Sequence, residues 1–104
     1  MVLDGASYTL QGTTDQGIRL AGRTNVTVQN IKIKTFQNGI VLSGSSNNNI
    51  ISGNTIANNG EGIALISSSS NRIYHNNFAD NLQQVYSLSS TNTWDDDYPS
   101  GGNY

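Results

Sequence analysis

The sequence contains no cysteine, one proline and few charged side chains. Without cysteine, the chain has neither a disulfide nor a thiolate metal site. Charged residues make up 12% of the chain, against about 25% in an average globular domain. The five basic residues are dispersed and the formal net charge is −2, so we expect no nucleic-acid surface. No apolar run approaches the roughly 18 residues of a transmembrane helix, so we also expect no membrane insertion.

A repeated phrase occupies the middle of the chain. Gly-Ile-x-Leu begins at Gly17, Gly39 and Gly62, at steps of 22 and 23 residues, and a degraded copy, "VYSL", begins at Val85. A second phrase keeps the same step, because "VQNIKI", "ISGNTI" and "IYHNNF" place apolar residues at matching positions. The chain is therefore built from repeats of 22–23 residues, each with two short apolar stretches and polar corners.

Within each phrase apolar residues alternate with others, as in Ile-x-Leu and Ile-x-Ile, which is typical of short strands with one inward face. Helices are not expected, because no window has helical spacing and Asn, Gly and Thr are poor helix formers. At about 3.3 Å per residue, a repeat of this length traces a loop of roughly 70 Å. Wound once, that loop is one coil of a single-stranded parallel β-helix, so the sequence predicts an all-β solenoid of about four coils.

Equivalent residues of successive coils are expected to stack into inward ladders that bury apolar side chains. The four predicted ladders are Ile18, Ile40, Ile63 and Val85; Leu20, Leu42 and Leu65; Val28, Ile51 and Ile73; and Ile33, Ile56 and Phe78. Gly and Asn suit the corners because both accept a positive φ. At one corner Asn54 should lie over Asn76 in an amide ladder, which starts one coil late because Ile31 occupies the first position.

We expect one domain spanning residues 1–104. Residues 1–16 form a partial first coil, residues 17–38, 39–61 and 62–84 form full coils, and residues 85–104 form a last strand and a C-terminal cap. Each open end of a solenoid is an unpaired strand edge, so terminal repeats usually depart from the pattern. In the tail, Trp94 is expected to cover the apolar interior of the last coil as a lid.

Several stretches resemble the repeats of NosD-type parallel β-helix proteins, namely "NVTVQNIKI", "NNNIISGNTIANNGEGIAL", "SSSSNRIYHNNF" and "NTWDDDYPSGGNY". The likeness covers essentially the whole chain and is to the versions common in archaeal secreted and surface proteins. It implies a right-handed β-helix of the class found in carbohydrate-binding proteins and sugar hydrolases. It also implies an extracellular or cell-surface location, although residues 1–10 carry no signal peptide.

The name-giving members of that family are associated with copper-site assembly. This chain has one His, one Met and no Cys, which leaves too few of the soft ligands that copper prefers. We therefore do not expect copper to be part of what the resemblance implies here.

Four outward residues are candidates for a ligand site. Lys32, Lys34, Arg72 and Tyr74 are expected on outward positions of neighbouring coils, where they would form a shallow groove for an anionic polysaccharide. The alternative is an ordinary charged exterior that keeps the solenoid soluble. No acidic cluster maps onto this face, so the base and carboxylate neutralisers of β-helix lyases are not expected there.

Two further groups have weaker functional interpretations. Asp95, Asp96 and Asp97 could hold Ca²⁺ through carboxylate oxygens, but they lack the spacing of calcium loops, and the alternative is a solvated acidic turn. His75, the only histidine, is a candidate general base or a polar corner residue. We expect the corner, because no carboxylate or nucleophile maps beside it. No other cofactor is expected.

Three function classes remain open. The favoured one is a non-catalytic extracellular module, serving as a scaffold or binding polysaccharide, because no catalytic constellation is visible. The second is a structural unit that self-assembles through its open ends. The third is a fragment of a polysaccharide lyase or epimerase, which rests on the fold alone.

Overall fold

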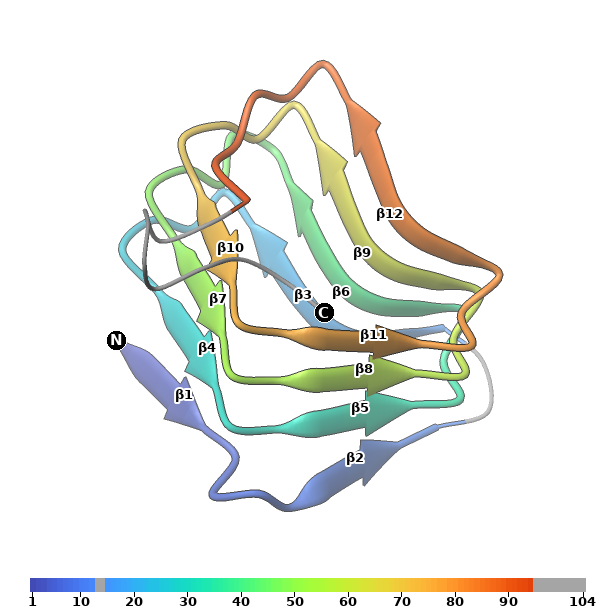
Figure 1. Ribbon diagram of the computed structural model, residues 1–104. Coiled ribbons are helices and arrows are strands. Elements are labelled where there is room, and N and C mark those ends of the chain that lie inside the picture. Colours follow the sequence, from blue (N-terminus) through green and yellow to red (C-terminus); the bar gives the residue numbers. More distant parts are fainter. Residues whose placement is uncertain (13–14, 95–104) are drawn as a thin grey trace.

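The computed structural model describes residues 1–12 and 15–94 of the chain. In these residues twelve strands form three parallel four-stranded sheets (Figure 1). The first sheet contains β1 (Val2–Asp4), β4 (Thr27–Gln29), β7 (Ile50–Ser52) and β10 (Arg72–Tyr74). The second contains β2 (Thr9–Gln11), β5 (Lys32–Lys34), β8 (Thr55–Ala57) and β11 (Asn77–Ala79). The third contains the longest strands, β3 (Gln16–Ala21), β6 (Asn38–Ser43), β9 (Glu61–Ile66) and β12 (Gln83–Leu88).

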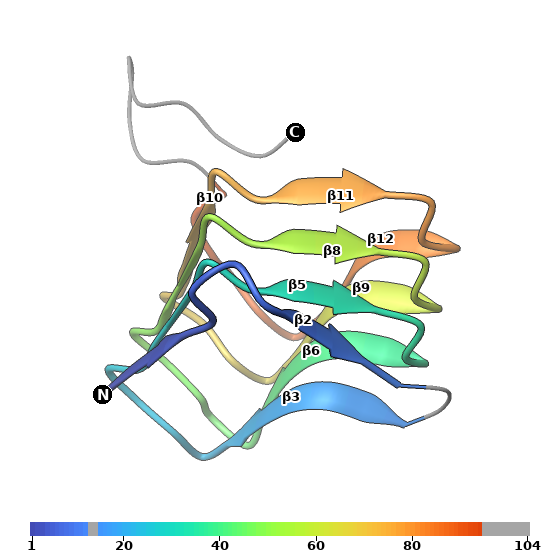
Figure 2. The ribbon, with the colours of Figure 1, turned by 90° about the horizontal axis from the view of Figure 1, so that it is seen from below.

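Each turn of the chain contributes one strand to every sheet, so the molecule is a parallel β-solenoid of about four turns (Figures 1 and 2). In the third sheet Ile40 pairs with Ile18 on one side and with Ile63 on the other. The pairing step is therefore 22 or 23 residues. The predicted all-β parallel solenoid and its repeat length are confirmed. No helix of the described chain is long and apolar enough to cross a membrane.

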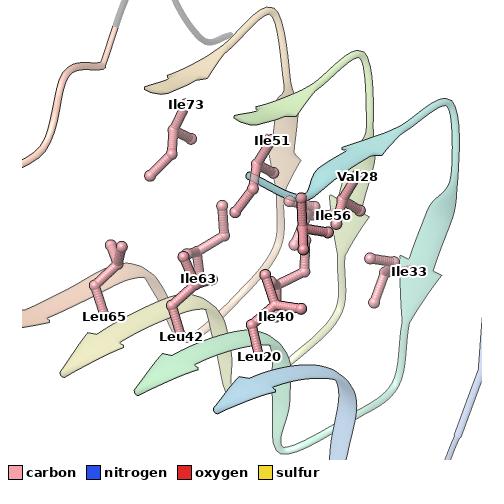
Figure 3. Close-up of a cluster of buried hydrophobic side chains, with 11 residues drawn as sticks. Leu20, Val28, Ile33, Ile40, Leu42, Ile51, Ile56, Ile63, Leu65 and Ile73 are labelled. Atoms are coloured by element: carbon pink, nitrogen blue, oxygen red, sulfur yellow. The ribbon is translucent and has the colours of Figure 1, made fainter. Parts of the chain in front are cut away.

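The core runs through the middle of the coils and consists of stacked aliphatic side chains that point toward one another from all three sheets (Figure 3). The register places the four apolar ladders as expected, with Leu20, Leu42 and Leu65 in one column and Val28, Ile51 and Ile73 in another. The nine fully buried members of the ladders are Val28, Ile33, Ile40, Leu42, Ile51, Ile56, Ile63, Leu65 and Ile73.

The N-terminal segment joins these ladders. Leu3 pairs with Val28 and Leu10 pairs with Ile33, so both residues extend columns that the repeat pattern did not assign to them. Neither is buried as the inner members are, because no coil lies beneath them; Leu3 is exposed and Leu10 is half-buried. The partial first coil thus contributes strands to two of the three sheets before the regular repeat begins.

Each repeat holds three strands rather than two apolar stretches. The second phrase is split in every coil by a corner residue with positive φ, namely Asn30 (54°), Gly53 (67°) and His75 (55°). Residues in this left-handed conformation bend the chain sharply and end the pairing of a strand. A six-residue phrase such as "VQNIKI" therefore spans one sheet, a corner and the start of the next sheet.

Buried polar side chains line the corners in four stacked columns. The predicted pair is present, because Asn54 Nδ2 donates to Asn76 Oδ1 at 3.0 Å. The sequence did not predict three further columns. They consist of Asn59 and Asn81; of Asn49, Asn71 and Asn92; and of Ser46, Ser68 and Ser90. Buried amides and hydroxyls are tolerated only when they are hydrogen-bonded, and among the described residues no buried side-chain nitrogen or oxygen lacks a partner.

The bonds of one amide show why the columns repeat. Asn54 Oδ1 accepts the backbone N–H of Ile31 in the coil before, at 3.1 Å. Its Nδ2 donates back to the carbonyl of Val28 at 3.1 Å and onward to the next amide. Each side chain therefore satisfies backbone groups that the corner removes from the sheets. In the first full coil, the residues at these four positions are Arg23, Val26, Ile31 and Phe36. Their backbone N–H groups donate to the first side chain of each column.

The glycine of each Gly-Ile-x-Leu phrase is required by close approach of the next coil. A Cβ atom on Gly17, Gly39 or Gly62 would lie 2.7, 2.6 or 2.5 Å from the carbonyl oxygen of the equivalent residue one coil later. Real Cβ atoms do not approach oxygen so closely. The repeated phrase therefore encodes stacking as well as strand structure.

Trp94 lies at the C-terminal end of the described chain. Thr93 forms a parallel bridge with Arg72, and the half-buried Trp94 packs against the core cluster. The role of Trp94 as a lid stays a prediction. The acidic residues Asp95, Asp96 and Asp97 lie outside the described residues.

Candidate functional site

The four outward candidates do not form one groove. Lys32 and Lys34 lie on β5 in the second sheet, whereas Arg72 and Tyr74 lie on β10 in the first sheet. The two strands also belong to different coils. β10 and β11 lie in the same coil, and in the second sheet β8 lies between β11 and β5. The expectation of neighbouring coils and a shared groove was wrong, because the corner at Asn30 sends the two halves of one phrase to different faces.

Arg72, Tyr74 and His75 form a small cluster of their own. The Arg72 guanidinium carbon lies 5.4 Å from the centre of the Tyr74 ring, and that ring meets His75 edge-on at 5.2 Å. His75 occupies the positive-φ corner, in line with Gly53 and Asn30. Its position is that of a corner residue, as the sequence suggested, and the ring contacts are those of ordinary surface packing.

A shallow groove of about 440 Å³ lies where the chain passes from the second sheet to the third, at the right of Figure 1. Its lining residues precede or begin β6, β9 and β12, and they are Gln37, Asn38, Gly60, Glu61, Leu82 and Gln83. Stacked coils build this groove, since each turn places the same two positions at its edge.

The first residues of the third-sheet strands form what we call the polar column, consisting of Gln16, Asn38, Glu61 and Gln83 in register. Asn38 Nδ2 donates a hydrogen bond to Glu61 Oε1, which orients the amide and the carboxylate together. Beside them Leu82 is 94% exposed. The groove therefore presents several hydrogen-bonding groups next to one bare aliphatic side chain, the combination that small-molecule sites use for orientation and contact.

Titratable groups are scarce in the groove. Of the described residues that line it, Glu61 alone carries a charge, and none is basic. Hydrolysis of a glycosidic bond normally uses two carboxyl groups on either side of that bond. Among the described residues that line the groove, Glu61 supplies one such group.

The family comparison matches residues 8–104 to a model described as "Periplasmic copper-binding protein (NosD)". The chain belongs to this family. Neither a curated protein nor a solved structure matched the NosD-family chain. The match agrees with the resemblance of the repeats, and the parallel solenoid is the architecture that this resemblance implied.

The described residues do not bring together a copper site of the kind that the family name suggests. Within residues 1–12 and 15–94, no group of three or more His, Cys, Asp or Glu side chains converges. The two soft candidates are also separated, because Met1 precedes β1, whereas His75 follows β10, three strands further along the same sheet. Copper sites need several such ligands around one ion, so no copper chemistry is assigned to the chain.

One carboxyl group has a clearly perturbed pKa, and it lies away from the groove. Asp4 accepts the backbone N–H of Ala6 at 2.8 Å and a bond from the Gln29 amide at 3.1 Å. These donors stabilise the carboxylate and lower the pKa of Asp4 below its usual value. The bonds hold together the turn after β1, so the shift is a feature of the N-terminal end.

Sequence reasoning missed the polar column although a signal was present. Its members Gln16, Asn38 and Glu61 each stand immediately before the glycine of a Gly-Ile-x-Leu phrase, and Gln83 stands at the same place in the fourth coil. Their chemical likeness at a step of 22 or 23 residues marks a polar stripe. The apolar residues that follow drew attention first, because they carry the core.

Proposed function

We propose that this NosD-family chain is a non-catalytic module that works outside the cytoplasm and binds an uncharged polysaccharide along the polar column. The observation that carries the proposal is the stack of Asn38, Glu61 and Gln83 beside the exposed Leu82 in one groove. The periplasmic description of the family supports the location.

The spacing of the polar column suits a linear polymer of hydroxyl-bearing units. Successive coils lie about 4.8 Å apart, so a chain that runs along the solenoid axis meets one amide or carboxylate per coil. Amides both donate and accept, and a carboxylate accepts from several hydroxyl groups. Leu82 offers an apolar surface on which the face of a sugar ring that presents C–H groups can pack.

The sign of the charge in the groove distinguishes between ligand classes. Glu61 carries a negative charge and the groove has no basic lining residue. An acidic polysaccharide would bring carboxylates close to Glu61, and like charges repel at such distances. The groove therefore favours a neutral chain over the anionic chain that the basic residues suggested.

The test is a binding titration by isothermal calorimetry with soluble neutral polysaccharides and, in parallel, with an acidic polyuronate. Glu61→Ala and Leu82→Ser are expected to weaken binding of a neutral chain about tenfold each, a loss of roughly 1.4 kcal/mol. The matched control is Lys32→Ser with Lys34→Ser on the second sheet, which should leave the affinity unchanged. Loss of affinity in the lysine variant alone would instead support the anionic ligand.

The same samples separate binding from turnover. A lyase or hydrolase would release new reducing ends or unsaturated products during prolonged incubation, and a binding module would not. Appearance of products that depends on Glu61 would contradict the non-catalytic proposal.

A further inference from the structure

The last turn of the solenoid has a glutamine where the other turns have a glycine. Gly17, Gly39 and Gly62 hold the second position of β3, β6 and β9, and Gln84 holds the second position of β12. The register is the same, because Gln83 pairs with Glu61 and Val85 pairs with Ile63 on either side of this position. Gln84 is exposed, and β12 is the outermost strand of its sheet.

A side chain at this position conflicts with a coil above it. At Gly39 a Cβ would lie 2.6 Å from the carbonyl oxygen of Gly62, and at Gly62 it would lie 2.5 Å from that of Gln84. The obstacle is backbone, which cannot move aside as the end of a flexible side chain can. By the same geometry, the Cβ of Gln84 occupies the place that a carbonyl oxygen of a fifth coil would need.

The Gln84 amide also takes over a bond that a further coil would make. Inside the solenoid, Asn59 Nδ2 donates to Asn81 Oδ1 of the next coil at 3.0 Å. At the end of this column Asn81 Nδ2 donates to Gln84 Oε1 at 2.7 Å, within the same coil. The oxygen of Gln84 thus takes the role that the amide oxygen of the next coil has in the Asn59–Asn81 pair.

We propose that Gln84 closes the C-terminal end of the solenoid, blocking a further coil through its Cβ and capping the Asn59–Asn81 column through its amide. The same turn carries a second sign of closure, since Ser87 replaces the leucine of the Leu20, Leu42 and Leu65 column. A second copy of the chain is therefore excluded from continuing the solenoid in register at this end. The proposal is independent of the polysaccharide groove.

Two elongated chains that differ at one residue test the steric part. In the first, residues 62–104 follow residue 83; in the second, residues 63–104 follow residue 84. Both chains gain one repeat, and they differ only in having Gly or Gln at position 84, which now lies beneath an added coil. We expect the Gly chain to unfold in one transition, and the Gln chain to unfold at least about 5 °C lower, as measured by circular dichroism. Equal midpoints, or failure of the Gly chain to fold, would overturn the proposal.

The capping part is tested in the parent chain. Gln84→Ala removes the acceptor for Asn81 and keeps the Cβ, whereas Gln84→Glu keeps an acceptor oxygen at the same reach. The alanine variant should melt about 2–4 °C below the parent, and the glutamate variant should recover most of that loss. If both variants melt at the same temperature, the amide of Gln84 does not act as a cap.

Discussion

The inner coils and the two ends of the solenoid share one backbone path but use different side chains at equivalent positions. At the second position of the third-sheet strands the inner coils require glycine, as at Gly39, and the last coil has Gln84. At the corners the inner coils hold amides such as Asn54, and the first full coil holds Ile31. At the second position of the third-sheet strands, the residue that fits thus depends on whether a coil follows it.

This difference reflects what each end must satisfy. An inner coil receives hydrogen bonds from one neighbour and donates them to the other, so its buried polar groups are all paired. The first coil supplies only backbone donors to the columns, through residues such as Ile31 and Phe36. In the last described coil, Asn81 donates to Gln84 of the same coil instead. Repeat proteins need distinct terminal units for this reason.

The largest contrast between an inner coil and an end is expected in the apolar columns. Ile51 is fully buried, whereas Leu3, at the N-terminal end of the same column, is 38% exposed. Ile51→Ala should lower the free energy of unfolding by about 4 kcal/mol because it leaves a cavity between two coils. Leu3→Ala should cost only about 1 kcal/mol. Urea unfolding of both variants measures the difference, and equal losses would show that the N-terminal turn is packed as tightly as the inner coils.

A smaller contrast is expected in the amide columns. Asn54→Ala leaves the buried N–H of Ile31 and the carbonyl of Val28 without partners, which should cost about 2–4 kcal/mol. Asn92→Ala removes bonds to the buried Asn71 and to the carbonyl of Ser68, but Asn92 itself is half-buried, so water can enter the place it leaves and the cost should be about 1 kcal/mol. Thermal and urea unfolding of the two variants give the comparison. A larger loss for Asn92 would mean that the end, rather than the middle, limits the stability of the column.

The smallest effect is expected at Asp4, on the N-terminal turn. Its pKa is lowered in the folded chain by the Ala6 N–H and the Gln29 amide, so the carboxylate stabilises the fold above the ordinary aspartate pKa of about 3.9. That contribution is lost as the pH falls through the lower pKa of the folded chain. Asp4→Asn should therefore reduce the melting temperature slightly near neutral pH and leave it unchanged in strong acid. A pH series of melting curves measures this, and a constant offset at every pH would contradict it.

The repeat made most of the fold predictable. The step between Gly17, Gly39 and Gly62 and the alternation around them indicated a parallel solenoid with about four turns and the correct apolar ladders. Only one of the four polar columns was found, since serines and asparagines in corners look like ordinary turn residues until their stacking is known. The split of each second phrase into two strands was missed for a similar reason, because a positive φ at Asn30 leaves no apolar signature.

The candidate site was less predictable than the fold. Basic residues such as Lys32 and Arg72 attracted attention by their chemistry, and the corners then placed them on different sheets. The polar column of Asn38, Glu61 and Gln83 consists of residues that are common on any surface. Their importance depends on lying side by side across coils, which a reading of single stretches does not reveal.

The sequence by itself determined the repeat length and the inward columns, because both follow from a local periodicity that the coils share. The tertiary structure decided which faces the charged residues occupy, which polar residues meet in a groove and where the solenoid ends. These features depend on the angle of each corner and on contacts between residues more than twenty positions apart. Local propensity does not specify such contacts, and stacking of the coils does.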